Sequence, residues 1–152
     1  MLRRVVEALG PRPWFRLAAS QVECLKSPTE YRDFIMEEIG QAKRRIRLAA
    51  LYLGAEQDDV CRALSRAMAD NASLRVSFLF DYMRCVRNTR HGTTLEKIAA
   101  LKRAHPRQVE AAFYAHPFIP KRWGQSGSKW SEILGVMHKK VNLFDDTTVL
   151  TG

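Results

Sequence analysis

A histidine and a lysine near the end of the chain, His138 and Lys140, are the residues whose type and spacing best suit chemistry. They stand two positions apart just before Val141, Leu143 and Phe144, apolar residues that predict a strand. Side chains alternate faces along a strand, so the imidazole and the ammonium would share one face. An imidazole can attack phosphorus, and a lysine can neutralise the oxygens of a phosphate as charge builds on them. This His–Lys pair therefore predicts a site for phosphoryl chemistry.

The residues after the His–Lys pair predict a β-hairpin. Asp145-Asp146 is a turn signal between two apolar runs, and the second run ends near Leu150. We expect Asn142 to share the face of the His–Lys pair, with Val141 and Leu143 pointing into the core. A histidine and a lysine on a solvated strand face are the alternative interpretation.

Positive charge is concentrated in the second half of the chain. The net charge is +9, and residues 84–107 and 115–140 carry most of the basic excess. This pattern favours an anionic partner, such as a phosphate ester, an anionic membrane surface or nucleic acid. Arg84, Arg87 and Arg90 could hold an anionic headgroup or a diphosphate, because arginine makes bidentate contacts to phosphate. A solvated basic loop is the alternative.

Hydrophobic periodicity predicts strands and helices that alternate along the chain. A capping box with proline at the first helical position opens one helix at 27–30, and a second capping box opens another at 93–96. Alternation of this kind indicates an α/β fold with a mixed, largely parallel sheet flanked by helices. The expected helices are 28–43, 56–69 and 94–104, and the expected strands before the hairpin are 46–53, 74–80 and 109–114.

Cysteine spacing and apolar runs argue against several classes of protein. Cys24, Cys61 and Cys85 lie far apart without a CxxC pair, which argues against a disulfide scaffold and a structural zinc site. We expect neither a metal nor another cofactor. The longest apolar run, 48–53, is far shorter than the ~18 residues of a membrane-spanning helix. The loop expected at 117–129 is long enough to be functional.

The first nineteen residues differ from the rest. They are rich in arginine and carry a single acid, Glu7, as organellar transit peptides do. Pro11 and Pro13 interrupt any helix there. We expect residues 1–19 to be a transit or flexible segment.

The spacing His138-x-Lys140-x4-Asp145-x6-Gly152 resembles the HKD signature of the phospholipase D superfamily. Upstream blocks select a narrower family, because they are similar to the opening of eukaryotic phosphatidylglycerophosphate synthases. The resemblance covers about residues 20–152. The blocks lie at 20–30, 42–46, 50–54, 81–84, 87–90 and 132–138.

The resemblance implies a phospholipase D-like domain at 20–152, the N-terminal one of two repeats, truncated at its C-terminal end. It implies phosphatidyl transfer from CDP-diacylglycerol to glycerol 3-phosphate without a cofactor, by a mitochondrial protein peripheral to the inner membrane. His138 would be the nucleophile that forms a phosphatidyl-histidine, and Lys140 a phosphate ligand. Asp145 fits the signature as a catalytic residue, although its place in a turn also suits an ordinary hairpin residue.

A second HKD motif occurs in members of this family, and this chain has none. We therefore expect the second histidine to come from missing sequence or from a second copy. One rival interpretation is a single-motif nuclease of the same superfamily, which pairs two short chains. Another is a non-catalytic basic binding fragment. The blocks at 20–54 favour the transferase, so nucleic acid is an unlikely partner.

Overall fold

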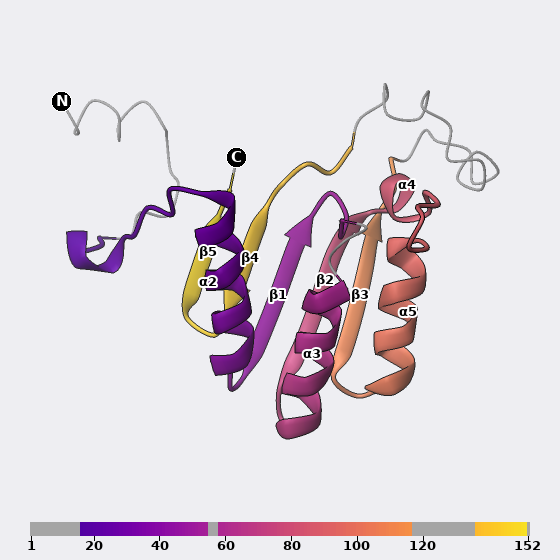
Figure 1. Ribbon diagram of the computed structural model, residues 1–152, viewed down its shortest axis with the longest axis horizontal. Helices are drawn as coiled ribbons and strands as arrows, with labels where there is room; N and C mark the ends of the chain where they lie inside the picture. The colour runs from indigo at the N-terminus through magenta and orange to yellow at the C-terminus, as the bar shows by residue number, and fades with distance from the viewer. Residues whose placement is uncertain (1–15, 55–57, 117–135, 152) are drawn as a thin grey trace. The chain divides into compact units, whose positions relative to one another are not determined.

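The computed structural model describes residues 16–54, 58–116 and 136–151 (Figure 1). The chain divides into two compact units, Met1–Tyr31 and Arg32–Gly152. Because the described residues begin at 16, most of the expected transit or flexible segment, 1–19, lies outside them. In the described part of the first unit, a 3-10 helix, η1 (Ala19–Gln21), precedes the start of helix α2 (Pro28–Gln41).

The larger unit alternates strands and helices, as the periodicity predicted. Its sheet has the strand order β3-β2-β1-β4-β5. Strands β1, β2 and β3 are parallel, whereas β4 pairs antiparallel with both β1 and β5. The predicted mixed α/β sheet is confirmed. The strands are β1 (Arg45–Ala50), β2 (Arg75–Asp81), β3 (Val109–Tyr114), β4 (Val141–Phe144) and β5 (Thr147–Leu150), and the helices after α2 are α3 (Asp58–Asp70), α4 (Tyr82–Cys85) and α5 (Thr94–Ala104).

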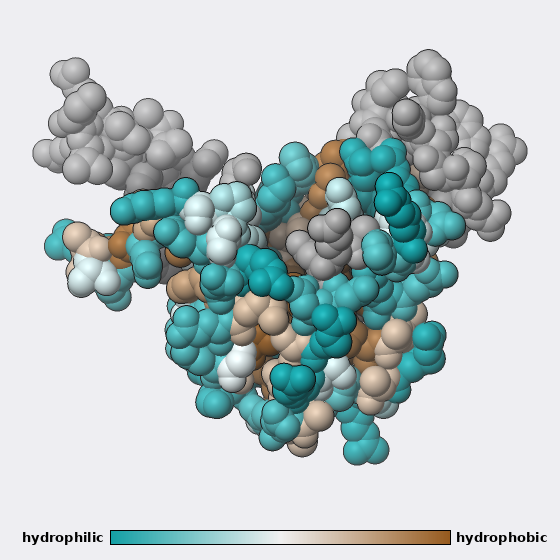
Figure 2. Space-filling model, in the orientation of Figure 1, coloured by the Kyte–Doolittle hydropathy of each residue, from teal (hydrophilic) through white to brown (hydrophobic). Residues whose placement is uncertain are grey.

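One face of the sheet forms the core with the helices. In Figure 1, α2, α3 and α5 lie over the same side of the strands. Figure 2 shows a largely hydrophilic surface over these helices, as expected of amphipathic helices that turn their apolar side to a sheet. The core strand residues on that face are Ile46, Leu48, Val76, Phe78, Phe80, Val109, Phe144 and Val149, and the buried helix residues include Ile35, Ile39, Leu64, Met68, Ile98 and Leu101.

The other face of the sheet keeps several apolar side chains exposed. The exposed fractions of Leu79, Tyr114, Val141 and Leu150 lie between 37% and 71%. The register puts Leu79, Val141 and Leu150 on one side, because each is connected to Ala49 through paired positions. Within the described ranges, no helix covers this side (Figure 1).

Local capping bonds explain where two of the helices begin. Thr93 caps α5 by accepting from the Glu96 amide at 3.1 Å, and Glu96 accepts from the Thr93 amide at 2.8 Å. This capping box is confirmed. At the start of α2, the Glu30 amide donates to Ser27 Oγ, but the Glu30 carboxylate accepts from the Lys26 amide. The reciprocal bond of that box therefore falls one residue earlier than predicted.

Candidate active site

The His–Lys pair lies at the edge of the sheet where the parallel strands end. Strand β4 runs antiparallel to β1 and pairs Val141 with Ala49, so the residues just before β4 lie beyond the carboxyl end of β1. His138 is exposed and Lys140 is half-buried. The Lys140 carbonyl accepts from the Thr151 amide at 3.3 Å, which continues the pairing of β4 with β5. In open α/β sheets this edge is the usual place for a ligand.

The buried face of β4 is the one that carries Asn142 and Phe144. Asn142 is 8% exposed and Phe144 is 1% exposed, whereas Val141 is 37% exposed. The expectation that Val141 and Leu143 point into the core is therefore wrong. The reason is the register with β1, which pairs Asn142 with Leu48 and puts it on the helix-covered face. Lys140 lies two residues before Asn142 and is half-buried, so it lies at the margin of the core.

A buried aspartate connects this segment to the neighbouring strands. Asp81 is the last residue of β2 and is 2% exposed. One carboxylate oxygen accepts from the Met137 amide at 3.0 Å, and the other accepts from the Arg84 amide at 3.2 Å, where Asp81 is the N-cap of α4. Because β1 lies between β4 and β2, the segment before β4 must reach past the end of β1.

The three arginines proposed as phosphate ligands follow β2 at the same edge. Arg84 lies in α4, and Arg87 and Arg90 lie in the connection from α4 to α5. Arg84 and Arg87 are half-buried and Arg90 is exposed. The structure thus brings basic side chains from two distant segments to the edge that carries His138.

A glycine turn and one hydrogen bond define the end of the connection that carries these arginines. Gly92 has a φ of +80°, and a Cβ added there would lie 2.9 Å from Glu96 Oε2, so glycine suits this position. Thr94 Oγ1 donates to the Leu53 carbonyl at 2.9 Å. The start of α5 is therefore attached to the loop that follows β1.

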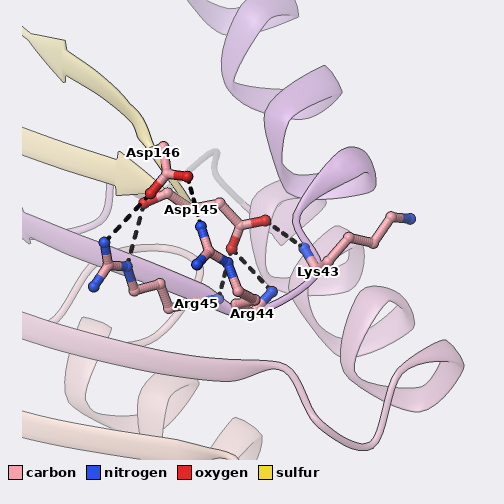
Figure 3. Close-up of polar contacts among 5 residues, drawn as sticks. All are labelled: Lys43, Arg44, Arg45, Asp145 and Asp146. Carbon is pink, nitrogen blue, oxygen red and sulfur yellow. Dashed lines mark hydrogen bonds and ion pairs between the residues drawn. The ribbon is translucent and has the colours of Figure 1, made fainter.

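The structure does not bring Asp145 to the His–Lys pair. It lies at the other end of β4, and its carboxylate accepts from three successive backbone amides, those of Lys43, Arg44 and Arg45, at 2.8–2.9 Å (Figure 3). Lys43 and Arg44 belong to the turn between α2 and β1, and Arg45 is the first residue of β1. Four strand residues separate the two ends of β4, a distance of roughly 13 Å. This geometry favours a hairpin residue over a direct catalytic role.

The protonation equilibrium of Asp145 agrees with its contacts. Burial alone would raise the pKa of the Asp145 carboxyl, but the bonds from the three backbone amides outweigh burial and lower it. Asp145 also has a φ of +48°, a conformation that aspartate tolerates better than most residues. Its neighbour Asp146 forms an exposed ion pair with Arg44 at 2.6 Å.

The other histidines separate into two groups. His105 lies at the opposite edge of the sheet, between α5 and β3, and its Nε2 is 2.9 Å from Ser65 Oγ. His91 lies between α4 and α5, and His116 follows β3. Both of these lie at the edge that carries His138, although no motif in the sequence marks them.

The buried thiol of Cys85 lies close to Asp81 but is not a candidate nucleophile. Burial and then the charge of Asp81 raise the pKa of Cys85 to about 12, so this thiol stays protonated. No cluster of three or more His, Cys, Asp or Glu that could hold a metal occurs in the part of the chain that the structure describes. Among the helices of the described ranges, none is both long and apolar enough to cross a membrane.

Some sequence predictions lie outside the described residues. They are the loop at 117–129, the tryptophans Trp123 and Trp130, the matching positions at 132–135 and Gly152 of the signature. Asp81 belongs to the block at 81–84, and the sequence alone predicted no role for it. One feature of the sequence could have indicated a role for Asp81. It ends an apolar strand and stands three residues before Arg84, whose amide an N-cap aspartate could bind.

Comparison with known proteins supplies the relatives of this chain. No family model matches it. The mitochondrial CDP-diacylglycerol–glycerol-3-phosphate 3-phosphatidyltransferase of Gallus gallus is 34% identical over 92% of this chain and 26% of its own length. The Homo sapiens protein of that name is 32% identical, and the Saccharomyces pastorianus protein is 28% identical over 91% of this chain. The chain spans about a quarter of the length of these relatives.

Solved structures agree with this relationship. A phosphatidylserine synthase from Haemophilus influenzae superposes with a TM-score of 0.71 and 27% identity, over 96% of this chain and 31% of that one. NucT from Helicobacter pylori superposes with a TM-score of 0.54 over 81% of this chain and 67% of that one, and at 20% identity it supports the fold alone. The chain therefore has a phospholipase D-like α/β fold, and its sequence relates it to the CDP-diacylglycerol–glycerol-3-phosphate 3-phosphatidyltransferases.

Proposed function

We propose that this chain is one part of a phosphatidylglycerophosphate synthase, which transfers phosphatidyl from CDP-diacylglycerol to glycerol 3-phosphate. The observation that carries the proposal is the position of His138 and Lys140 at the edge where β1, β2 and β3 end, beside the basic segment after β2. The relatives that share the sequence over nine tenths of this chain carry that activity in their names.

His138 is the nucleophile in the first half-reaction. An imidazole nitrogen forms a bond to the phosphorus of the phosphatidyl group, and the bond from that phosphorus to the CMP oxygen breaks. CMP leaves with the electron pair, and a phosphatidyl-histidine remains. The exposure of His138 supports this role, because a diacyl substrate must approach the imidazole from outside the domain.

Lys140 stabilises the negative charge that develops on the phosphate oxygens. Its half-buried position, two residues before the buried Asn142, restricts the ammonium more than that of a fully exposed lysine. A restricted cation beside the reacting phosphorus loses less entropy and meets less screening by water. Lys139, which is exposed, provides a matched control of the same charge and length.

The arginines after β2 bind the rest of the diphosphate. Arg84 and Arg87 are half-buried, so their guanidinium groups are less free than those of a solvated basic loop. Arginine presents paired donors to phosphate oxygens. Arg90 is exposed and contributes mainly long-range attraction.

The second half-reaction needs a second histidine. A hydroxyl of glycerol 3-phosphate attacks the phosphorus, the N–P bond breaks, and a base takes the hydroxyl proton. The second histidine comes from a second HKD half, supplied by further sequence or by a second copy of this chain. Asp145, which the HKD spacing includes, holds the hairpin and takes no direct part in either step.

The protein acts in mitochondria, at the surface of the inner membrane. Its relatives from Gallus gallus and Homo sapiens are named as mitochondrial, and its net charge of +9 suits an anionic lipid surface. Binding to anionic vesicles should weaken as salt rises. Equal binding to neutral and anionic vesicles at every salt concentration would contradict this attachment.

A radiolabel experiment tests the function. The chain, alone and mixed with a second HKD half, is incubated with CDP-diacylglycerol labelled in the diacylglycerol phosphate, and the label retained on protein and the CMP released are measured. We expect an acid-labile, base-stable label that His138→Ala abolishes and Lys139→Ala retains. A parallel DNA-cleavage assay tests the single-motif nuclease, which the shared fold and the basic charge would also suit. DNA cleavage without transfer of the label to protein would overturn the proposal. If the chain shows neither activity, it is a binding fragment.

A further inference from the structure

The carboxylate of Asp81 occupies an unusual position among the described residues of the edge that carries the His–Lys pair. It is 2% exposed, and its two oxygens accept from two different segments, from the Met137 amide at 3.0 Å and from the Arg84 amide at 3.2 Å. Met137 lies 56 residues further along the chain and immediately precedes His138. One carboxylate therefore joins the nucleophile segment to the first arginine of the basic segment.

The two segments have no strand contact that would fix their separation. Strand β1 lies between β2, which carries Asp81, and β4, which follows His138. Residues 136–140 precede β4 and have no regular structure. The bond from Met137 to Asp81 therefore defines how far this segment extends across the sheet edge.

We propose that Asp81 is a positioning residue, which holds the backbone of the His138 segment and the start of α4 at a separation that lets one diphosphate contact both. This inference rests on the proposed function, because it assigns the two segments to one substrate. The catalytic groups remain His138 and Lys140, and Asp81 acts through the backbone that carries them. Misplacement of a reacting group by about 1 Å can cost roughly 100-fold in rate.

The need for two acceptors distinguishes this role from ordinary capping. A helix N-cap needs one side-chain oxygen, which serine or asparagine also provides. Only a carboxylate offers two equivalent acceptor oxygens, whereas an asparagine would turn an N–H group toward one of the two donors. Asp81→Ser and Asp81→Asn should therefore keep the cap on the Arg84 amide and lose the bond to the Met137 amide.

Amide hydrogen exchange measures the bond without any assay of activity. In the unmodified chain, we expect the Met137 amide to exchange slowly, and in Asp81→Asn and Asp81→Ser to exchange at least tenfold faster, with the Arg84 amide still protected. Thr93→Ala is the matched control, because it removes an N-cap bond from α5 and none from residues 136–140. Fast exchange of the Met137 amide in the unmodified chain, or no change in the Asp81 variants, would overturn the proposal.

Kinetics then separates positioning from stability. In the assembly that turns over CDP-diacylglycerol, the Asp81 variants should lower kcat about 10- to 100-fold and change KM less than about threefold. Thr93→Ala should lower the melting temperature about as much as the Asp81 variants do, but it should leave kcat within about twofold of the unmodified value. If Thr93→Ala lowers kcat as much as the Asp81 variants do at the same loss of stability, Asp81 is only a structural cap. If the unmodified assembly transfers no phosphatidyl group, the proposed function fails while the exchange result still stands.

Discussion

The two ends of strand β4 make opposite uses of polar side chains. Before β4, His138 is exposed and Lys140 is half-buried. The backbone of this segment is held by two hydrogen bonds, from the Met137 amide to Asp81 and from the Thr151 amide to the Lys140 carbonyl. After β4, the Asp145 carboxylate accepts from three backbone amides, two in the turn that precedes β1 and one at the first residue of β1 (Figure 3). One end leaves side chains available to a ligand, and the other uses a side chain to complete the fold.

This difference teaches that one sequence signature can serve two physical purposes. The spacing His138-x-Lys140-x4-Asp145 spans a strand, and a strand of four residues separates its ends by roughly 13 Å. A nucleophile needs a fixed backbone and an accessible side chain. Three successive amides that point to one place instead need an acceptor, because a donor without a partner costs free energy.

The largest effect is expected when a single copy of this chain, with one His138, is compared with a pair of copies. We expect a monomer of this chain to turn over no CDP-diacylglycerol, because a second histidine near the phosphorus is required. If two copies pair, the specific rate should rise with protein concentration, and mixing with His138→Ala chains should inactivate hybrid pairs. Rate measurements across a dilution series, with mass photometry of the same samples, check this.

His116 and His91 provide the controls for that experiment, because they lie at the same edge as His138. His116→Ala and His91→Ala chains should support hybrid activity at the unmodified level. A monodisperse monomer with a concentration-independent specific rate would contradict the pairing. Loss of that rate in His116→Ala would then place the second histidine within this chain.

The next effect compares two neighbouring lysines at the chemical end of β4. Lys140→Ala should lower kcat by about 100- to 1,000-fold, the usual cost of removing one group that stabilises charge in the transition state. Lys139→Ala removes the same charge from an exposed position and should change kcat less than about threefold. Steady-state kinetics of both variants checks the difference, and equal losses would mean that overall charge matters and position does not.

A smaller effect is expected at the structural end. Asp145→Ala leaves three backbone amides without their acceptor and should lower the free energy of unfolding by about 2 kcal/mol at pH 7. Urea denaturation measures the change, while the rate per folded molecule should stay within about threefold. A loss of rate far larger than the loss of folded protein would restore a catalytic role to Asp145.

The acid dependence of stability sharpens the same point. Because the pKa of Asp145 is lowered in the folded state, its carboxylate stabilises the fold above its ordinary pKa. That contribution should be lost as the pH falls below about 4, through the folded-state pKa. Asp145→Asn should therefore be less stable than the unmodified chain at pH 7 and nearly equal to it at pH 2–3. Urea denaturation at both pH values checks this, and a constant difference would exclude the carboxylate charge as the cause.

The smallest effect concerns the ion pair beside Asp145. Arg44 and Asp146 approach to 2.6 Å, but their side chains are 63% and 80% exposed. Exposed pairs contribute about 0–1 kcal/mol, so Asp146→Asn should change stability by less than about 0.5 kcal/mol. Denaturation in low and high salt measures this, and a change as large as that of Asp145→Ala would contradict the division of roles between the two aspartates.

The sequence by itself determined most of the local structure. Helix α5 begins at the predicted capping box of Thr93 and Glu96, and β3 has the predicted bounds Val109–Tyr114. The turn at Asp145-Asp146 joins β4 and β5 as its residue types indicate. These features depend on side chains and backbone groups within a few residues of one another, so local spacing is sufficient to predict them. The short helix α4 was not predicted, because its four residues show no helical period.

Only the tertiary structure decided which groups meet. Strand β4 pairs with β1 instead of β3, and this register turns Asn142 toward the core instead of Val141. The same pairing brings Asp145 to amides 100–102 residues earlier, and Met137 to Asp81, which lies 56 residues earlier. Alternation along a strand defines two faces but does not say which is buried, because that depends on the partner strand and on the helices that cover it. Hence local spacing marked His138 and Lys140, whereas the roles we infer for Asp81 and Asp145 required contacts between distant segments.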